Sequence, residues 1–501
     1  MIEQLPALLV VAPILAATVS LVAGLRWRRA GWAVTTLTLA GLFAMALWLT
    51  AEVYLGGERV IHQLGGFPRP VGIELIADRL STLISIVVTG IALGVLGYTR
   101  LGGPRGNGFY TMYLLLVGGL LGVTFTGDVF NLFVFLEITG LTTYAIVAKG
   151  ESGESAIAAL RYLVIGTVGA SLYLIGVGYL FMATGTLNMI DLSAALAEVG
   201  YDDTLVRVGF VFVFVGFAIK VALFPLHSWQ PDAYQRAPDG ATPLVSALVS
   251  TASAYALFRV IYTVFTVEFL RATPYVNEVI VTIGSVSVLA GTTLAVLQTD
   301  VKRMLAYSSV SQFGLIVLAY GLATQTALVG SLVHLLGHGL MKGGLFLAVG
   351  VIAAGTGART VDEYAGLAQR RPFAAGALAV LGLALVGVPP SVGFVGKWFI
   401  AVGAVEAGVW PVAAVVFLST MLTLAYVARL LEKMYFTPPE TRTRAYTPEN
   451  PLAADGGSDD PVSKGMLAVT LLATVLVVAL GFAGGTFDSL LGPFVEGILN
   501  G

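Results

Sequence analysis

The sequence predicts an all-α membrane protein with about fourteen transmembrane helices, because its apolar residues fall in runs of about 20, the length that crosses a bilayer. Apolar residues make up 57% of the 501 positions and charged residues only 11%. A soluble domain carries about 45–50% apolar and about 25% charged residues. Mean hydropathy is +0.88.

The predicted spans follow one another along most of the chain. They cover residues 5–25, 31–51, 77–99, 109–127, 129–148, 157–184, 205–235, 242–266, 275–298, 303–323, 327–353, 373–403, 409–435 and 465–491. The first run is followed by its basic cluster, whereas a signal peptide is preceded by one, so we expect a retained helix. Residues 436–464 are polar and rich in proline and glycine, which predicts a solvated linker.

Composition also excludes several functions. The net charge of −2 argues against a nucleic-acid partner. The chain has no cysteine, which excludes disulfides, iron–sulfur ligation by this chain and cysteine catalysis. We therefore expect no cofactor bound by the chain.

The basic residues predict an orientation. If the amino terminus lies outside, most of the 27 Lys and Arg residues fall in inside loops, as the positive-inside rule requires. Both termini then lie outside and the 436–464 linker is cytoplasmic. Lys220, Lys342 and Lys397 fall in no loop. An ionisable group at bilayer depth costs at least about 2.5–3.5 kcal/mol and marks a functional site by default.

Glu137 lies deep in the span 129–148. A carboxylate and a lysine that are buried together favour each other's charged form, so we predict that Glu137 pairs with Lys220 and controls its protonation. Opposite charges about 4 Å apart are worth about 4 kcal/mol at an effective dielectric of 20, which is adequate for gating. The alternative is a structural carboxylate bonded to a neighbouring helix.

His334, His338 and Lys342 are four residues apart. This spacing places them in one polar stripe along about 12 Å of helix. A stripe of titratable groups in an apolar helix suits a proton relay. Two alternatives are unrelated polar residues packed against other helices, and a zinc site built from the two histidines, for which the sequence shows no obvious third ligand.

Prolines adjoin two of the three lysines. Pro225 follows Lys220, and Pro389 and Pro390 precede Lys397. Proline removes a backbone donor and clashes with the carbonyl four residues earlier, so we expect broken helices that line a cavity or are buried in protein. Transporters use such breaks at their ion sites.

The reversed order of lysine and proline predicts two inverted repeats of five spans each. The expected organisation is an amino-terminal segment (1–104), a first repeat (105–270), a second repeat (271–435), the linker (436–464) and a carboxy-terminal helix (465–501).

Four stretches together resemble the antiporter-like membrane subunits that respiratory complex I and the Mrp cation/proton antiporters share. They are DVFNLFVFLEITGLTTYAIV, KVALFPLHSWQPDAYQRAPDGATPLVSAL, DVKRMLAYSSVSQFG with HLLGHGLMKGGLFLAVG, and GVPPSVGFVGKWF. The resemblance covers about residues 105–435. It implies fourteen helices, two inverted repeats and an aqueous polar axis along the membrane midplane. It also implies Glu137 and Lys220 as a proton-pumping pair, Lys342 and the histidines as a central connection, and Lys397 as a second proton site.

Within this family, the lysine at position 397 and the chain length favour the D-type subunit of an Mrp antiporter. One position departs from the pattern, because many D-type subunits carry a lysine in the eighth helix where Thr251 stands here. Either a water held by Thr251 or Ser253 takes its place, or the relay is weakened in a divergent paralogue.

The expected function is proton translocation in a multisubunit Na⁺/H⁺ antiporter of the cell membrane, with other subunits, protons and Na⁺ as partners and no enzymatic activity. Two alternatives stay open: a subunit of a redox-driven pump such as complex I or a membrane-bound hydrogenase, and a structural subunit that has lost transport.

The remaining candidates carry less weight. Asp128 is expected to cap the fifth helix, and Lys302 and Arg303 to be inside residues, with Lys302 and His227 as accessory candidates for the proton path. We expect solvated or interfacial positions around the third span for Arg59, Arg69, Asp78 and Arg79, and an outside position for Arg259.

Overall fold

The computed structural model describes residues 2–27, 30–150, 152–439 and 461–500. Nearly all of these residues are helical, and twelve helices in this part of the chain are long and apolar enough to cross a membrane. The predicted all-α membrane fold is confirmed, while the number of fourteen crossings stays a prediction. Most of the predicted linker, residues 440–460, lies outside the described residues.

The twelve long helical segments of the described residues correspond to predicted spans; the last, Lys464–Asn500, comprises both α19 and α20 and extends beyond the predicted end at 491. Their helices are α1 (Leu5–Arg26), α2 (Ala30–Gly56), α3 (Arg79–Gly102), α4 (Asn107–Phe125), α5 (Val129–Val147), α6 (Gly153–Thr184), α10 (Thr242–Arg259), α12 (Val276–Val296), α13 (Val301–Leu322), α14 (Gln325–Thr356), α18 (Trp410–Phe436), α19 (Lys464–Ala479) and α20 (Gly484–Asn500). A π-helical turn, η3 (Val260–Phe265), joins α10 to α11 (Thr266–Ala272), and a 3-10 turn, η6 (Leu480–Ala483), joins α19 to α20.

The two spans in which a proline adjoins a buried lysine are each divided into two helices. The span 205–235 consists of α8 (Thr204–Lys220) and α9 (Trp229–Arg236). The span 373–403 consists of α16 (Pro372–Val386) and α17 (Val392–Glu406). None of these four helices reaches the length of about 20 residues that a bilayer requires.

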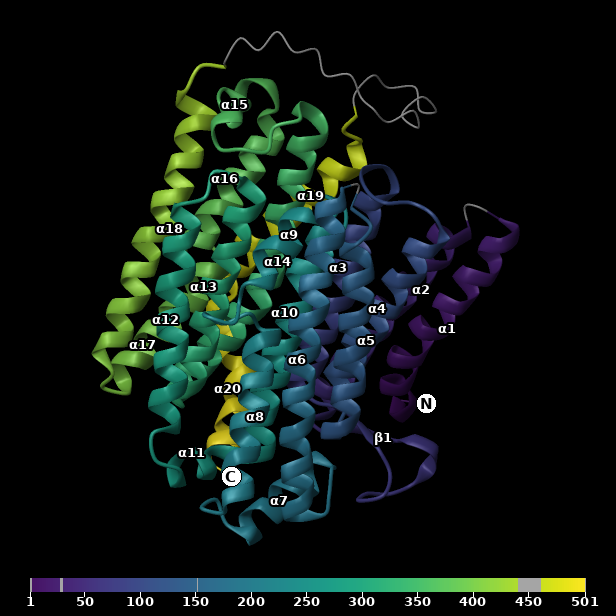
Figure 1. Cartoon of the computed structure of the whole chain (residues 1–501), viewed down its shortest axis with the longest axis vertical. Helices are drawn as coiled ribbons and strands as arrows, with labels where there is room; N and C mark the ends of the chain where they lie inside the picture. The colour runs from purple at the N-terminus through teal and green to yellow at the C-terminus, as the bar shows by residue number, and fades with distance from the viewer. Residues whose placement is uncertain (1, 28–29, 151, 440–460, 501) are drawn as a thin grey trace.

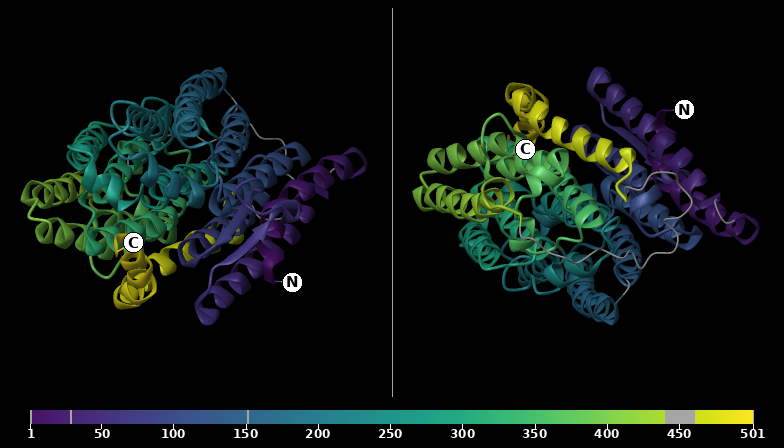
Figure 2. Two further views of the ribbon diagram at one scale, coloured as in Figure 1. Left: turned by 90° about the horizontal axis from the view of Figure 1, so that it is seen from below. Right: turned by 90° about the horizontal axis from the view of Figure 1, so that it is seen from above.

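The helices differ strongly in how deeply they are buried within the protein. The α10, α13 and α14 spans are each 94% buried, whereas those of α1 and α2 are 28% buried. In Figure 1, α1 and α2 lie at one edge of the bundle and α17 and α18 at the opposite edge. Figure 2 shows α19 and α20, in yellow, running along one side of the bundle. The buried charges of the central helices therefore face other helices rather than lipid.

Some elements at the helix ends were not predicted. A hairpin pairs β1 (Val60–Gln63) with β2 (Glu74–Ala77) in antiparallel register, and α7 (Met189–Val199) is a short helix after α6. The start of α1 and the end of α20 lie towards the same end of the bundle as α7 and β1 (Figure 1). Two further short helices are α15 (Leu367–Arg370) and the 3-10 turn η4 (Asp362–Tyr364).

Candidate functional site

The first break follows Lys220, the last residue of α8. The helix closes in a Schellman motif, in which the Leu223 amide donates to the Ala218 carbonyl at 2.8 Å and the Ala222 amide donates to Ile219 at 3.1 Å. Ala222 has a φ of 63°, a left-handed conformation that costs a non-glycine residue about 1–2 kcal/mol. The chain therefore leaves the helix abruptly, directly after its lysine.

Side chains from neighbouring elements satisfy the polar groups that the break exposes. Trp229 Nε1 donates to the carbonyl of Ile219 at 2.9 Å, and the amide of Phe224 donates to Ser287 Oγ of α12 at 3.1 Å. Such partners are required because an unpaired backbone group within a membrane costs several kcal/mol. Side chains of α9 and α12 thus hold the backbone of the break in a defined conformation.

Lys220 forms an ion pair with Glu137 of α5. Its Nζ lies 3.0 Å from Glu137 Oε1, and the two side chains are 9% and 21% exposed. The sequence predicts this pairing, and the geometry brings the two residues together. Glu137 is therefore the less buried partner of the pair, and part of its side chain lies at the surface of the protein.

Tyr144 and two glycines surround this pair. A Cβ placed on Gly140 would lie 2.9 Å from the Tyr144 hydroxyl and 3.5 Å from Lys220 Nζ, and one on Gly166 would meet the same hydroxyl at 2.1 Å. The Tyr144 hydroxyl is buried and has no hydrogen-bond partner among the described residues. Glycine at both positions therefore creates the room in which a polar hydroxyl lies near the lysine.

The second break, after α16, closes in the same way as the first. The Val388 amide donates to the Leu383 carbonyl and the Gly387 amide donates to Ala384, both at 3.0 Å. Gly387 has a φ of 97°, so glycine occupies the left-handed position that Ala222 takes in the first break. The Ser391 side chain then caps the start of α17.

Lys397 of α17 reaches back across this break. Its Nζ donates to the carbonyls of Leu385 and Val386, each at 3.0 Å, and the residue is 5% exposed. These carbonyls form the negative end of the α16 dipole. Unlike Lys220, Lys397 has no carboxylate partner among the described residues.

The predicted stripe on α14 is fully buried and faces α13. Lys342 Nζ donates to the Leu305 carbonyl at 2.8 Å and bonds to Ser308 Oγ. His334 Nε2 lies 2.8 Å from Gln312 Oε1. All three stripe residues, His334, His338 and Lys342, are 0% exposed. They contact different residues of one neighbouring helix, so the stripe forms half of a polar seam between α13 and α14.

The histidines connect this seam to the second break. A Cβ placed on Gly396 would lie 2.6 Å from His334 Cβ, so the α17 backbone touches His334 one residue before Lys397. His338 packs edge-on against Phe313 with ring centroids 4.5 Å apart. Both ring nitrogens of His338 lack a hydrogen-bond partner among the described residues.

Lys302 lies at the other end of the seam, and it is 4% exposed rather than an open loop residue. Its Nζ donates to the Ala237 carbonyl at 2.7 Å and pairs with Asp239 at 3.0 Å. Asp239 also binds Arg359 at 2.9 Å. Burial raises the pKa of Asp239, but Lys302 and Arg359 lower it more. The pKa of this carboxyl therefore lies below its ordinary value, and the group is charged at neutral pH.

The accessory candidates have modest roles in the structure. Thr251 is 2% exposed and its hydroxyl lacks a partner among the described residues, whereas Ser253 Oγ donates to Val249 at 3.0 Å. His227 lies in the first break beside Phe224, with ring centroids 5.2 Å apart. The capping role of Asp128 is confirmed, because its side chain accepts from the Asn131 amide at 2.6 Å.

The prediction of a solvated or interfacial Asp78 is wrong, because Asp78 pairs with Arg259 inside the protein, while the outside position of Arg259 stays a prediction. Asp78 caps α3 and binds Arg259, the last residue of α10, with side-chain exposures of 18% and 13%. Arg259 Nε also donates to the Tyr255 hydroxyl at 2.9 Å. Arg259 lies inside the continuous apolar run that follows Thr242. This position in the sequence could have indicated a buried, paired arginine.

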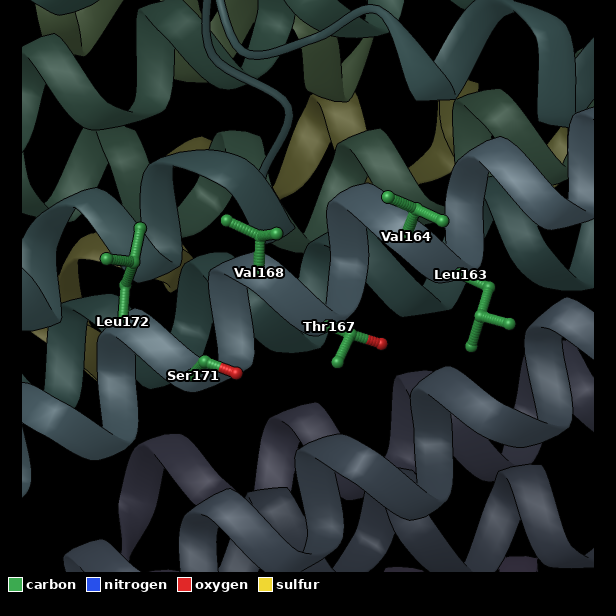
Figure 3. A pocket seen from close by; sticks show the side chains of 6 residues that line it. All are labelled: Leu163, Val164, Thr167, Val168, Ser171 and Leu172. Carbon is green, nitrogen blue, oxygen red and sulfur yellow. The ribbon is translucent and has the colours of Figure 1, made fainter.

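One cavity lies apart from the charged residues of α8, α14 and α17. This cavity of about 510 Å³ on the face of α6 is almost wholly apolar. It has no titratable residue in its lining, so it does not extend the polar site. Figure 3 shows the side chains that line it, Leu163, Val164, Thr167, Val168, Ser171 and Leu172. The described residues contain no cluster of three metal-ligating side chains, which gives the zinc alternative no support.

The family is shown by comparison with known proteins. The family model described as NADH:quinone oxidoreductase/Mrp antiporter, TM, matches residues 126–423, more than half of the chain. The chain belongs to this antiporter-like membrane subunit family. The matched segment contains Glu137, Lys220, the α14 stripe and Lys397, so the family assignment covers the whole candidate site.

Relatives of this chain carry names from two kinds of complex. The N subunit of the NADH-quinone oxidoreductase of Desulforudis audaxviator is 39% identical over 96% of both chains. The D subunit of the Na⁺/H⁺ antiporter of Bacillus subtilis is 30% identical, over 76% of this chain and 77% of that one.

Solved structures divide in the same way. A chain of an archaeal membrane-bound sulfane sulfur reductase is 30% identical with a TM-score of 0.88, covering 99% of this chain and 98% of that one. A chain of the Mrp complex from Dietzia is 27% identical with the same TM-score, covering 99% of both. The protein is thus an antiporter-like membrane subunit that works with other subunits, without an indicated redox centre of its own.

Proposed function

We propose that this subunit translocates protons along a buried line from Lys220 through the α14 stripe to Lys397. The observation that carries the proposal is the ion pair at the first break, where Nζ and Oε1 are 3.0 Å apart. A lysine held by a single movable carboxylate changes its affinity for a proton when that carboxylate moves. At an effective dielectric of 20, opposite charges about 4 Å apart contribute about 4 kcal/mol, or about a thousandfold in proton affinity.

The rest of the line supports the same role. The α14 stripe is fully buried and carries three titratable groups. His334 lies against the α17 backbone beside Lys397, whose ammonium is held by carbonyls alone. The two breaks with their matching Schellman closures also support the proposal of inverted repeats at 105–270 and 271–435, flanked by segments 1–104, 436–464 and 465–501.

The placement in the membrane forms part of this proposal. We place the chain in the plasma membrane with both termini outside and the 436–464 linker in the cytoplasm, because most basic residues then face the cytoplasm. The start of α1 and the end of α20 lie towards the same end of the bundle (Figure 1), which is compatible with this placement.

As its driving complex we propose a monovalent cation/proton antiporter of the Mrp type, in which Na⁺ moves against the protons. The identity of 30–31% with proteins named as D subunits of Na⁺/H⁺ antiporters supports this choice. The second candidate is a redox-driven complex, which the 39% identity with a protein named as the N subunit of an NADH-quinone oxidoreductase favours. In that case the same line would move protons while partner subunits transfer electrons.

Transport in inverted membrane vesicles that contain the whole complex tests the site. Lys220→Ala and Lys397→Ala should each abolish proton movement while the complex still assembles. Lys149→Ala, which removes an exposed lysine after α5, is the matched control and should transport normally. Normal transport by the Lys220→Ala complex would refute the proposal.

The same vesicles separate the two candidate complexes. Collapse of a preformed pH gradient on addition of Na⁺, without any electron donor, supports the antiporter. Proton uptake that starts only when an electron donor is supplied supports the redox-driven complex. The third alternative, a structural subunit that has lost transport, predicts wild-type behaviour when Lys220→Ala and Lys397→Ala are combined.

A further inference from the structure

We propose that Tyr234 and Ser250, positioned by Gln230, form an uncharged proton link between the Lys220 ion pair and the α14 stripe. The inference rests on the proposed function, because a link is required only if protons pass between these two charged parts of the site. It assigns a role to three buried polar residues that lie outside the charged line described above.

The three side chains form a closed hydrogen-bonded triangle between α9 and α10. Gln230 Nε2 donates to the Tyr234 hydroxyl and to Ser250 Oγ, both at 3.2 Å, and the two hydroxyls lie 3.4 Å apart. All three residues are 0% exposed. A hydroxyl both donates and accepts, so these two can exchange a proton when they approach to the usual O–H···O distance of about 2.5–3.0 Å.

One end of the triangle adjoins the first break. Gln230 follows Trp229, whose Nε1 binds the carbonyl of Ile219 at 2.9 Å, and Ile219 directly precedes Lys220. The backbone of the triangle is thus attached to the turn of helix that carries the lysine. A displacement of Lys220 and a displacement of α9 are therefore coupled through this hydrogen bond.

The other end faces the α14 stripe. A Cβ placed on Gly343 would lie 3.5 Å from the Cβ of Ala247, and Gly343 follows Lys342. Ser250 lies three residues after Ala247, on the same side of α10. The Tyr234 ring packs edge-on against Phe346 of α14, with ring centroids 5.9 Å apart. Both hydroxyl-bearing residues therefore belong to the surface that meets α14.

Several buried polar atoms of the triangle, of α10 and of the α14 stripe lack partners among the described residues. Gln230 Oε1, Thr251 Oγ1 and both ring nitrogens of His338 have no hydrogen-bond partner among the described residues. Buried polar atoms are rarely left unsatisfied, and ordered water is their usual partner where protein supplies none. Their positions, on α9, α10 and α14 in turn, follow the direction from the triangle to the stripe.

The proton balance of the link is simple. Lys220 would give up one proton to ordered water, the usual partner of such buried polar atoms, and the water would pass a proton to a lone pair of the first hydroxyl as that hydroxyl releases its own proton to the next acceptor. After a proton has passed to His338, each hydroxyl again holds one proton and rotates back to its starting orientation. Gln230 carries no proton, since its amide orients the two hydroxyls, and it is a positioning residue.

The test is proton transport by the whole complex in vesicles. Tyr234→Phe combined with Ser250→Ala removes both hydroxyls and keeps the aromatic ring, and we expect the rate to fall about tenfold or more, equivalent to one lost hydrogen-bonded contact of about 1.4 kcal/mol. Tyr113→Phe is the matched control. This variant removes a fully buried hydroxyl on α4, which donates to the carbonyl of Ala92 on α3 at 2.6 Å, and it should leave the rate unchanged.

A solvent isotope measurement separates proton transfer from a structural effect. In Tyr234→Phe alone, the ratio of rates in H₂O and D₂O should rise above the wild-type ratio, because the interrupted link becomes rate-limiting. A lower rate with an unchanged ratio, or an unchanged rate, would overturn the link. If Lys220→Ala is inactive while the variants that lack hydroxyls are normal, the link fails and the proposed function stands. If Lys220→Ala is active, the proposed function itself fails.

Discussion

Replacing Lys220 by arginine separates the two roles that its ion pair can have. A structural pair needs only a positive charge near Glu137, and the guanidinium supplies that charge with several donors for the carboxylate now held at 3.0 Å. A proton carrier needs a group that also exists in its neutral form. Lys220→Arg therefore preserves the pair and removes the release of the proton.

The size of the expected effect follows from the intrinsic proton affinities. In peptides, arginine holds its proton about 2–3 pKa units more tightly than lysine, so its neutral form is about 100- to 1000-fold rarer. The pair contributes the same charge in both proteins, so this difference carries over to the site. We expect transport by the Lys220→Arg complex to fall at least about 100-fold, with normal assembly and thermal stability.

The assay is proton movement in inverted vesicles, with the amount of assembled complex measured in the same membranes. Lys149→Arg makes the same exchange at an exposed position and should have no effect. Wild-type transport by the Lys220→Arg complex would refute the reasoning, because it would show that Lys220 holds Glu137 without ever releasing a proton.

Three further changes test other parts of the structure. Ala222→Gly should raise the midpoint of thermal unfolding of the purified complex, because the left-handed backbone strain of about 1–2 kcal/mol that it relieves exceeds the entropy cost of about 0.5–1 kcal/mol that glycine adds; a lower midpoint would contradict this. Gly396→Ala places a Cβ 2.6 Å from His334 and should reduce transport up to about 100-fold, whereas Gly376→Ala meets nothing within 4 Å and should be silent. Asp78→Asn should destabilise the protein at neutral pH. Burial raises the pKa of Asp78, but its arginine partner and hydrogen bonds lower it below the ordinary 3.8. Its contribution is therefore complete above pH 3.8 and lost as the pH falls through the folded value, so the wild type and Asp78→Asn should converge only in strong acid; a difference that is already absent at about pH 6 would exclude this pair as a stabilising element.

The helices and both breaks could be predicted because they depend on local sequence. A run of about 20 apolar residues has no stable alternative to a helix in a membrane. Proline disfavours the helix interior, and a break was expected where a proline adjoins a buried lysine; Pro13 and Pro493, which adjoin none, lie inside the continuous helices α1 and α20. The pairing of Glu137 with Lys220 could also be predicted, because a carboxylate and a lysine that are buried together favour each other's charged form. Both residues were recognisable as charges within apolar runs.

The partners of Lys397 and of Arg259 could not be predicted, because they depend on the path of the chain. The carbonyls that hold Lys397 are free only because α16 ends at Val386, and the chain path after that residue decides which carbonyls face the lysine. Arg259 lies near a helix end, and sequence places such ends only to within a few residues. The hydrogen-bonded triangle of Gln230, Tyr234 and Ser250 depends on how α9 folds back after the break, which no local pattern specifies.

The two lysine sites share a backbone design but differ in what holds the ammonium group. At the first break, a carboxylate on another helix faces Lys220; at the second, the carbonyls of the preceding half-helix face Lys397. A full negative charge stabilises an ammonium more strongly than two carbonyl dipoles do, and it can be withdrawn by a movement of α5 relative to α8, whereas the carbonyls are attached to the break itself. In the proposed mechanism, proton binding at Lys220 is therefore adjustable and proton binding at Lys397 is nearly constant. Under that proposal, an adjustable site next to a constant one would give the line between them a direction: Lys220 would release a proton towards Lys397 when the carboxylate withdraws and would bind another when the carboxylate returns.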